Sequence, residues 1–328
     1  PMSRPARIPS GFIVIGLLLC TAACHELDFD SLASETTGKD LILEEDSLAI
    51  WPQDLTHLSL GLIPFMDRSE LEAAYAPLLD HLGRRLGVKV DLVLADSYAD
   101  LGRRMRNQEI DLGLFSALSY VQAKKADPGL RLTLKQVAEG SGTYIGYVYC
   151  LDDVPAQSIL DLRGHSICWV DPQSTSGYLY PRLLLKRAGQ DPDNFFSSNI
   201  FGTNHMDCLE RVLTGEVDAG ATYSTTFSIA RDKGLPIHRL RILAKTPPIP
   251  FDAYCVRSQL PDKAAKRLTQ ELLRLSTRTP DGMRVLTNKM KLNAWVEAED
   301  SDYDSVRAAL FTVDGAAARE PQDPTSPE

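Results

Sequence analysis

The hydrophobic pattern of residues 58–125 alternates between the period of a strand and the period of a helix. The runs that fit strands lie at 58–63, 88–94 and 110–115. The segments with helical spacing lie at 69–86, 98–107 and 117–125. This alternation predicts a mostly parallel sheet, in which ligands bind at the carboxyl ends of the strands. Pro64, Tyr98 and Ser116 fall at that edge.

A second alternation begins after residue 152. Its expected elements are a short helix at 159–162, strands at 166–170, 217–221 and 240–244, and helices at 177–188 and 223–233. Another strand-to-helix junction lies at 201–207. Two extended segments, 143–151 and 251–257, connect this part to the first. A chain that leaves one lobe, builds another and returns predicts an α/β protein with two β/α lobes joined by hinge strands.

The expected domain limits follow from these patterns. Lobe 1 takes 57–148 and 253–315, which also contain a strand at 132–137 and helices at 263–276 and 281–291. Lobe 2 takes 149–252. Residues 25–56 are polar and acidic with little periodicity, which predicts a flexible tether, and 316–328 are expected to form a disordered tail.

The first 24 residues predict export. Arg4 and Arg7 precede a short apolar run at 12–19, and small residues at 21–23 lead into Cys24. The run is too short for an ordinary spanning helix, and the layout is that of a signal peptide. The segment resembles a bacterial lipoprotein signal with lipidation at Cys24, although Thr21 stands where Leu is usual. A plain cleaved signal or an uncleaved anchor is the alternative; the expected location is the periplasm or cell surface.

The formal net charge is −9 and the isoelectric point is about 5.3. Nucleic-acid binding needs a basic face that releases counterions, so we expect no nucleic-acid partner. A small anion is not excluded, because neutral dipoles can hold it at short range.

Four cysteines lie beyond the leader: Cys150, Cys168, Cys208 and Cys255. They form no CxxC motif and no Cys/His cluster, so we expect no metal site and no cofactor. An exported protein can hold a disulfide, and Cys150 with Cys255 is the first pair to test because both lie on the connecting strands. Four buried free thiols are the alternative.

The stretch Asp171–Tyr178 reads Asp-Pro-Gln-Ser-Thr-Ser-Gly-Tyr and stands between an expected strand and an expected helix. A helix N-terminus carries unpaired N–H groups and a partial positive charge, and hydroxyls add further donors. No Lys or Arg lies between Val170 and Leu179, and neutral donors suit an anion that must be released again. The stretch therefore predicts an anion site; the alternative is that Ser174 or Thr175 only caps the helix.

Several motifs together resemble one family. They are residues 61–64, 95–98, 110–113, 119–123, 161–164, 171–178, 204–205, 217–220 and 249–252. The chain resembles the substrate-binding proteins of phosphate, phosphite and phosphonate ABC transporters, which have the two-lobed type II periplasmic binding fold. The resemblance covers roughly residues 58–275. Its most specific part is the Ser-Thr-Ser-Gly-Tyr loop with His205 downstream.

The resemblance implies seven residues that bind a small phosphorus oxyanion. They are Ser174, Thr175, Ser176, His205, Tyr98, Tyr144 and Asp252. The loop hydroxyls and the histidine would hold the oxygens, the two tyrosines would close from the other lobe, and the aspartate would contact the far side. Each has a structural alternative: a cap for the histidine, core positions for the tyrosines and a turn for the aspartate.

The resemblance also narrows the ligand and implies the partner. Family members that take up aminoalkyl phosphonates carry a second acidic residue shortly after the segment that corresponds to 217–219. Residues 222–226 read Thr-Tyr-Ser-Thr-Thr here, with no carboxylate. This favours phosphite, phosphate or a small alkyl phosphonate. The implied partner is an ABC permease, and the protein itself is expected to be a monomer.

Two other functions use the same residues. Ser174, His205 and Asp218 or Asp252 have the residue types of a nucleophilic triad, but no GxSxG motif surrounds the serine. We therefore expect no catalytic residues and no enzyme. A sensor module that passes ligand occupancy to a signalling partner would use the same site as a transport protein.

Overall fold

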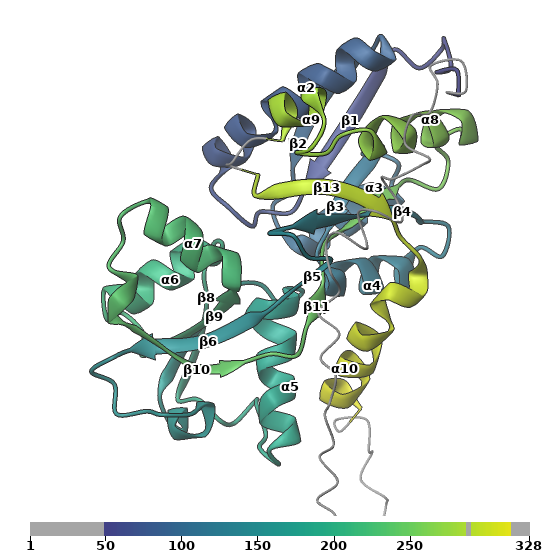
Figure 1. Ribbon diagram of the computed structural model, residues 1–328. Helices are drawn as coiled ribbons and strands as arrows, with labels where there is room; N and C mark the ends of the chain where they lie inside the picture. Colours follow the sequence, from purple (N-terminus) through teal and green to yellow (C-terminus); the bar gives the residue numbers. More distant parts are fainter. Residues whose placement is uncertain (1–48, 287–289, 316–328) are drawn as a thin grey trace, which may run out of the picture.

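Two sheets organise the chain, one in each of two lobes (Figure 1). The computed structural model describes residues 49–286 and 290–315. The expected signal 1–24 with Cys24, most of the expected tether and the expected tail 316–328 lie outside the described residues. The end of the tether is described and rests on lobe 1, where Ala49 N donates to Gln270 Oε1 at 3.0 Å.

The sheet of lobe 1 has six strands in the order β13-β4-β12-β3-β1-β2. Their bounds are β1 His57–Leu62, β2 Lys89–Leu94, β3 Leu112–Phe115, β4 Arg131–Ala138, β12 Ala253–Val256 and β13 Leu292–Glu297. Strands β1, β2 and β3 are parallel, as the sequence predicts, and β12 runs antiparallel to both β3 and β4.

The sheet of lobe 2 has five strands in the order β10-β6-β9-β7-β8. Their bounds are β6 Gly146–Leu151, β7 Ser166–Trp169, β8 Ser198–Phe201, β9 Ala219–Tyr223 and β10 Leu240–Lys245. The strand β7 pairs in parallel with β8 and β9, whereas β6 is antiparallel to β9 and to β10.

Helices pack around each sheet, and the inner strands β3, β9 and β12 are buried along nearly their whole length. In lobe 1 the helices are α2 (Arg68–Leu86), α3 (Tyr98–Arg106), α4 (Ala117–Ala126), α8 (Asp262–Leu273) and α9 (Pro280–Val285). In lobe 2 they are α5 (Tyr180–Arg187), α6 (His205–Leu213) and α7 (Ser224–Asp232). One buried cluster joins α3 and α4 to α6 and α7, so apolar packing continues from lobe to lobe.

Two short strands connect the lobes, β5 (Thr143–Tyr144) and β11 (Ile249–Pro250). They pair antiparallel, with Ile249 opposite Tyr144. The chain thus leaves lobe 1 beside the place where it returns. The predicted α/β architecture of two lobes with hinge strands is confirmed.

The C-terminal part differs from the expectation. The helix expected over 281–291 is α9, which ends at Val285. Residues 292–297 form the edge strand β13, and Asp304–Asp314 form α10, neither of which the hydrophobic pattern indicated. The helix α10 lies beside α5 of lobe 2 (Figure 1), so the chain contacts lobe 2 again after its return to lobe 1.

Each lobe is fastened by the same pair of side chains, which we call a Ser–Asp clasp. In lobe 1, Asp111 Oδ2 accepts from Ser59 N and Ser59 Oγ at 2.8 and 2.9 Å. In lobe 2, Asp218 Oδ2 accepts from Ser166 N and Ser166 Oγ at 2.8 and 2.7 Å. Asp218, which has the residue type of a triad member, therefore has a structural role within lobe 2.

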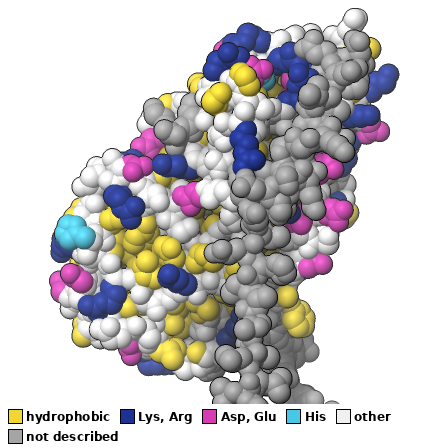
Figure 2. Space-filling model, viewed as in Figure 1, with side chains coloured by type: hydrophobic (Ala, Val, Ile, Leu, Met, Phe, Trp, Pro, Cys, Tyr) yellow, Lys and Arg dark blue, Asp and Glu magenta, His cyan; other side chains and the backbone are white. Residues whose placement is uncertain are grey.

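The surface of lobe 2 carries hydrophobic side chains over β6 and β10, with Lys and Arg around them (Figure 2). Ile242 of β10 is among the large exposed apolar residues. Within the part of the chain that the structure describes, no helix has both the length and the apolar character needed to cross a bilayer.

The four described cysteines are all buried with free thiols. Cys150 lies in β6 and Cys255 lies in β12, so the first candidate pair for a disulfide is divided between two sheets. The structure does not pair them.

Candidate functional site

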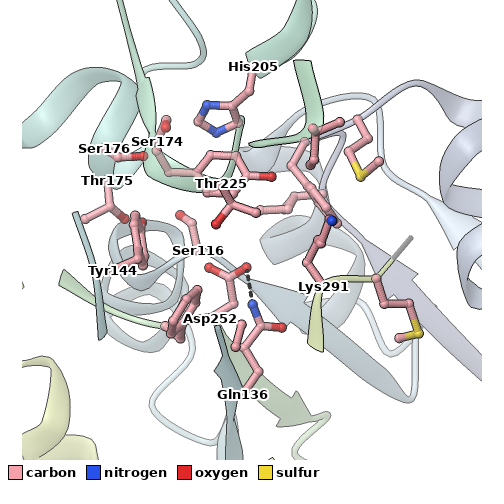
Figure 3. Close-up of a pocket in the computed structure, with 18 of the residues that line it drawn as sticks. Ser116, Gln136, Tyr144, Ser174, Thr175, Ser176, His205, Thr225, Asp252 and Lys291 are labelled. Atoms are coloured by element: carbon pink, nitrogen blue, oxygen red, sulfur yellow. Dashed lines mark hydrogen bonds between the residues drawn. The ribbon is translucent and has the colours of Figure 1, made fainter. Parts of the chain in front are cut away.

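A cavity of about 60 Å³ lies between the lobes, next to the hinge strands (Figure 3). This volume exceeds the roughly 10–15 Å³ that holds one water molecule, so the cavity has room for a ligand of a few non-hydrogen atoms. Phosphate and methylphosphonate each have five non-hydrogen atoms. All seven residues that the sequence indicated line the cavity: Tyr98, Tyr144, Ser174, Thr175, Ser176, His205 and Asp252.

The loop 171–178 forms the lobe 2 wall of the cavity. It continues into a π-helical turn, η3 (Thr175–Leu179), which leads directly into α5. Ser174 caps this turn, because its Oγ accepts from Gly177 N at 3.0 Å. Figure 3 shows Ser174, Thr175 and Ser176 grouped together beside the cavity. The helix cap by Ser174 is therefore present, and the same residue also lines the cavity.

Lobe 1 donates hydrogen bonds to the same loop. Ser116 Oγ donates to the carbonyl oxygen of Gln173 at 2.9 Å, and Leu118 N donates to Thr175 Oγ1 at 2.8 Å. The threonine hydroxyl accepts this bond, so its own proton is left to donate. The two lobes are therefore in direct polar contact at the site.

His205 is the first residue of α6 and faces the cavity. Its Nδ1 lies 2.8 Å from Thr222 Oγ1, and its Nε2 lies 3.5 Å from the Tyr98 hydroxyl of the other lobe. Burial lowers the pKa of His205 to about 3, so the ring is neutral at physiological pH. A neutral imidazole offers one donor and one acceptor, without a fixed positive charge.

The tyrosines supply neutral donors. Burial raises the pKa of the Tyr98 and Tyr144 hydroxyls, which therefore stay protonated. The Tyr144 ring lies 5.0 Å from the Phe251 ring and 6.0 Å from the Tyr223 ring, measured between centroids. These contacts hold the tyrosine beside the hinge.

Asp252 lies across the cavity from the loop, between β11 and β12 (Figure 3). Gln136 Nε2 donates to its Oδ2 at 3.4 Å (Figure 3). Burial raises the pKa of Asp252 to about 7, so the carboxyl is protonated in part of the molecules at neutral pH. In its protonated form it can donate a hydrogen bond to an oxyanion.

Five helical segments begin at this cavity. They are α3 at Tyr98, α4 with the cap Ser116, η3 with the cap Ser174, α6 at His205 and α7 at Ser224. Each N-terminus adds partial positive charge and unpaired N–H groups. A small anion can therefore be stabilised here mainly by neutral donors.

Sequence reasoning missed Thr225. Its side chain is 3% exposed and lines the cavity, and its Oγ1 has no hydrogen-bond partner among the described residues. A buried hydroxyl without a partner is uncommon and costs free energy. Thr225 lies in the first turn of α7, where a threonine is so ordinary that only the folded arrangement distinguishes it.

Lys291 was also missed. Among the described residues that line the cavity, it is the one Lys or Arg. Its Nζ lies 3.0 Å from Asp232 Oδ2 of lobe 2, so part of its charge is balanced there. Asp252 is the only carboxylate among the described lining residues. An amine on the ligand would therefore find one acidic partner in this lining rather than two.

The geometry does not form a nucleophilic triad. The two ring nitrogens of His205 contact Thr222 and Tyr98, and no hydrogen bond joins the ring to Ser174 in the described part of the chain. The described residues also contain no group of three or more His, Cys, Asp or Glu that could hold a metal ion. The arrangement can bind and release an anion.

Comparison with known proteins gives a consistent result. The family model of the periplasmic substrate-binding protein of phosphonate ABC transporters matches residues 60–303. The phosphate-import protein PhnD of Mycolicibacterium smegmatis is 30% identical over 310 residues, which are 87% of this chain and 92% of that protein.

Two solved structures share the fold. A binding protein component of an ABC phosphonate transporter from Pseudomonas aeruginosa has a TM-score of 0.74 and 19% identity, over 82% of this chain and 90% of that chain. PhnD1 of Prochlorococcus marinus, solved with methylphosphonate, has a TM-score of 0.71 and 19% identity, over 77% of this chain and 97% of that chain. Both comparisons confirm the predicted two-lobed type II periplasmic binding fold.

Proposed function

Because the chain belongs to the family of periplasmic substrate-binding proteins of phosphonate ABC transporters, we propose that it captures a small phosphorus oxyanion between its lobes and delivers it to an ABC permease. The observation that carries the proposal is the convergence of five helical N-termini and a hydroxyl-rich loop on one small cavity. Ser174, Thr175, Ser176 and His205 bind the oxygens in this proposal.

The favoured ligands are phosphate, phosphite and methylphosphonate. Their size fits a cavity of about 60 Å³. The side of the cavity formed by Ile63, Phe65 and Met66 is apolar and suits a methyl group. The relative that imports phosphate and the fold relative solved with methylphosphonate are consistent with this range.

A thermal-shift panel tests the proposal on purified protein. Phosphate, phosphite and methylphosphonate are compared with sulfate and aminoethylphosphonate at equal concentration. A ligand at 100 times its dissociation constant stabilises by about 2.7 kcal/mol. We expect at least one of the first three to raise the melting temperature most. No shift with any phosphorus oxyanion up to millimolar concentration would contradict the proposal.

Thr225→Val should weaken binding and stabilise the empty protein. In our proposal the unpartnered hydroxyl donates to the ligand, and a hydrogen bond to a charged group contributes about 1.5–3 kcal/mol. We therefore expect a dissociation constant roughly ten to a hundred times higher by calorimetry. Because the valine removes a buried hydroxyl without a partner, the melting temperature without ligand should stay equal or rise.

The matched control is Thr269→Val on α8, whose hydroxyl donates to the carbonyl oxygen of Ala265 outside the cavity. It should leave the dissociation constant unchanged. Equal affinity of Thr225→Val and the wild type would remove Thr225 from the ligand contacts.

Ligand binding should close the lobes. The described contacts across the cleft include Asn204 Nδ2 to Asp67 Oδ1 at 2.9 Å and Lys233 Nζ to Glu70 Oε1 at 2.5 Å. The hinge is the two-stranded β5–β11 ladder, so a rotation there separates these partners and exposes the cavity. Small-angle scattering should show a smaller radius of gyration at saturating ligand, and identical curves would argue against closure.

The protein acts as a monomer on the outer side of a membrane in this proposal, tethered through a lipid on Cys24. The observation behind the tether is the small-residue stretch at 21–23 that precedes this cysteine. Cys24→Ser should therefore release the protein into the soluble fraction, as seen on immunoblots of separated membranes. Continued membrane association of the variant would refute a lipid on this residue.

A further inference from the structure

Two buried thiols of lobe 2 lie in close contact. Cys168 is in β7 and Cys208 is in α6, and their Sγ atoms are 2.8 Å apart. Carbon atoms, which are smaller than sulfur, make optimal non-bonded contacts at about 3.5–4.0 Å. A separation of 2.8 Å is therefore short for two sulfur atoms that are not bonded. In a disulfide the two sulfur atoms are about 2.05 Å apart, so only a small displacement separates the pair from a covalent bond.

The reduced thiols can share a hydrogen bond, and the groups around them are otherwise a backbone carbonyl and a glycine. Both sulfur atoms lie near the carbonyl oxygen of Trp169, Cys208 Sγ at 3.2 Å and Cys168 Sγ at 3.7 Å. No third metal-binding side chain joins them among the described residues. A side chain at residue 202 would collide with them, because a Cβ added to Gly202 would lie 2.6 Å from Cys208 Sγ.

We propose that Cys168 and Cys208 form a disulfide when the chain folds in an oxidising compartment. The family is periplasmic, and disulfides form and persist in the periplasm. The two thiols lose two protons and two electrons as the S–S bond forms. A disulfide-bearing oxidant accepts the electrons by thiol–disulfide exchange and leaves as two thiols.

The bond forms before α6 packs on β7. Only a thiolate attacks a disulfide, and the hydrogen bond with Cys168 together with burial raises the pKa of the Cys208 thiol. Both side chains are fully buried in the folded protein, so an oxidant has no access to them. A chain that folds in the reduced form should consequently stay reduced.

The position of the bond gives it a consequence for the cavity. Cys168 lies on the strand that leads into the loop 171–178, and Cys208 lies one helical turn after His205. The disulfide would fix the distance between the element that presents the hydroxyls and the element that presents the imidazole. This inference concerns lobe 2 alone and does not depend on which anion is bound.

Peptide mapping of the full chain, secreted to the periplasm of an expression host, tests the proposal. Free thiols are alkylated in denaturant without reduction, and the protein is digested with trypsin. Each described cysteine lies on its own tryptic peptide: 136–163, 164–182, 188–211 and 246–257. We expect 164–182 joined to 188–211, with the other two peptides alkylated. Alkylation of all four peptides, or a bond that involves Cys150 or Cys255, would overturn the proposal.

A second measurement needs no cross-linked peptide. The protein is unfolded, treated with reductant and refolded before melting, because the buried bond is closed to reductant in the folded state. Loss of a bond between cysteines 40 residues apart should lower the melting temperature by roughly 4–8 °C. The double variant Cys168→Ala, Cys208→Ala should show no response to reductant, whereas Cys150→Ala should respond like the wild type. An equal response in the double variant would also overturn the proposal. The anion thermal shift is a separate readout, so failure of either proposal leaves the other testable.

Discussion

Gly177→Ala should weaken anion binding at least a hundredfold. A Cβ added at this glycine would lie 2.5 Å from Val170 Cγ2 and 2.9 Å from Ser174 Oγ, which are distances that real Cβ atoms do not show. We therefore expect the loop to move away from Val170 and the cap from Gly177 N to Ser174 Oγ to break. Loss of two hydrogen bonds to a charged ligand, at about 1.5–3 kcal/mol each, gives the expected factor.

The measurement is calorimetric titration with the best ligand of the thermal-shift panel. Overpacking of this kind reduces the free energy of unfolding by about 1–3 kcal/mol, so the variant should still fold. Gly142→Ala is the matched control, because a Cβ there has no atom within 4 Å and the residue precedes β5 at the hinge. Unchanged affinity in Gly177→Ala with an intact melting curve would show that the loop does not hold the ligand.

Ligand affinity should depend on pH partly through ionisable groups of the protein, and Asp252→Asn should remove most of that part. Burial raises the pKa of Asp252 to about 7, so the carboxyl is mostly protonated at pH 6 and mostly ionised at pH 8.5. An ionised carboxylate repels an anion, whereas an amide donates a hydrogen bond at every pH. We expect the affinity of the variant relative to the wild type to rise by roughly tenfold per pH unit above 7.

Because the same ligand is titrated into both proteins, its own ionisation cancels in that ratio. Asp96→Asn is the control, since the side chain of Asp96 is 84% exposed. The neutral His205 contributes no change of charge above pH 5, because burial lowers its pKa to about 3. A ratio that stays constant from pH 6 to 8.5 would place Asp252 away from the bound anion.

The empty protein should respond to the same substitution. The pKa of this carboxyl is about 7 in the folded protein and near 4 in the unfolded chain. Its ionised form therefore destabilises the folded state relative to its protonated form. The stability that protonation provides is present below pH 4 and is lost as the pH rises through about 7. The melting temperature of Asp252→Asn without ligand should therefore exceed that of the wild type at pH 8.5 and match it near pH 4.

The sequence predicts the elements whose hydrophobic period is strong. The parallel strand β1 and the first half of β2 alternate apolar with polar or small residues, β3 is a short apolar run, and the loop 171–178 stands between a strand and a helix. The edge strand β13 was missed because only Leu292 and Trp295 of its six residues are buried, which gives no clear alternation. The helix α10 was missed although Val306, Ala309 and Val313 are buried at helical spacing.

The cavity itself needed the folded chain. The seven expected residues could be named from the sequence because the loop and the helix starts are visible in it. Their motifs also resemble those of one protein family. The absence of a partner for the Thr225 hydroxyl depends on what surrounds it in the folded chain. Lys291 lies at the end of the helix expected over 281–291, and the actual helix α9 ends at Val285, so the place of Lys291 at the cavity was not visible in the sequence. The raised pKa of Asp252 likewise depends on its burial, and the residues that bury it come from distant parts of the sequence.

The hydrogen bonds of the two Ser–Asp clasps lie within the lobes, in contrast to those that cross the cleft. Ser59–Asp111 and Ser166–Asp218 each lie within one lobe, so they survive when the lobes part. The bond from Leu118 N to Thr175 Oγ1 crosses the cleft and is exchanged for water, which changes the free energy by only about 0.5–1.5 kcal/mol. If the lobes part as proposed, each lobe therefore keeps its internal hydrogen bonds, and the same molecule can bind ligand again without refolding.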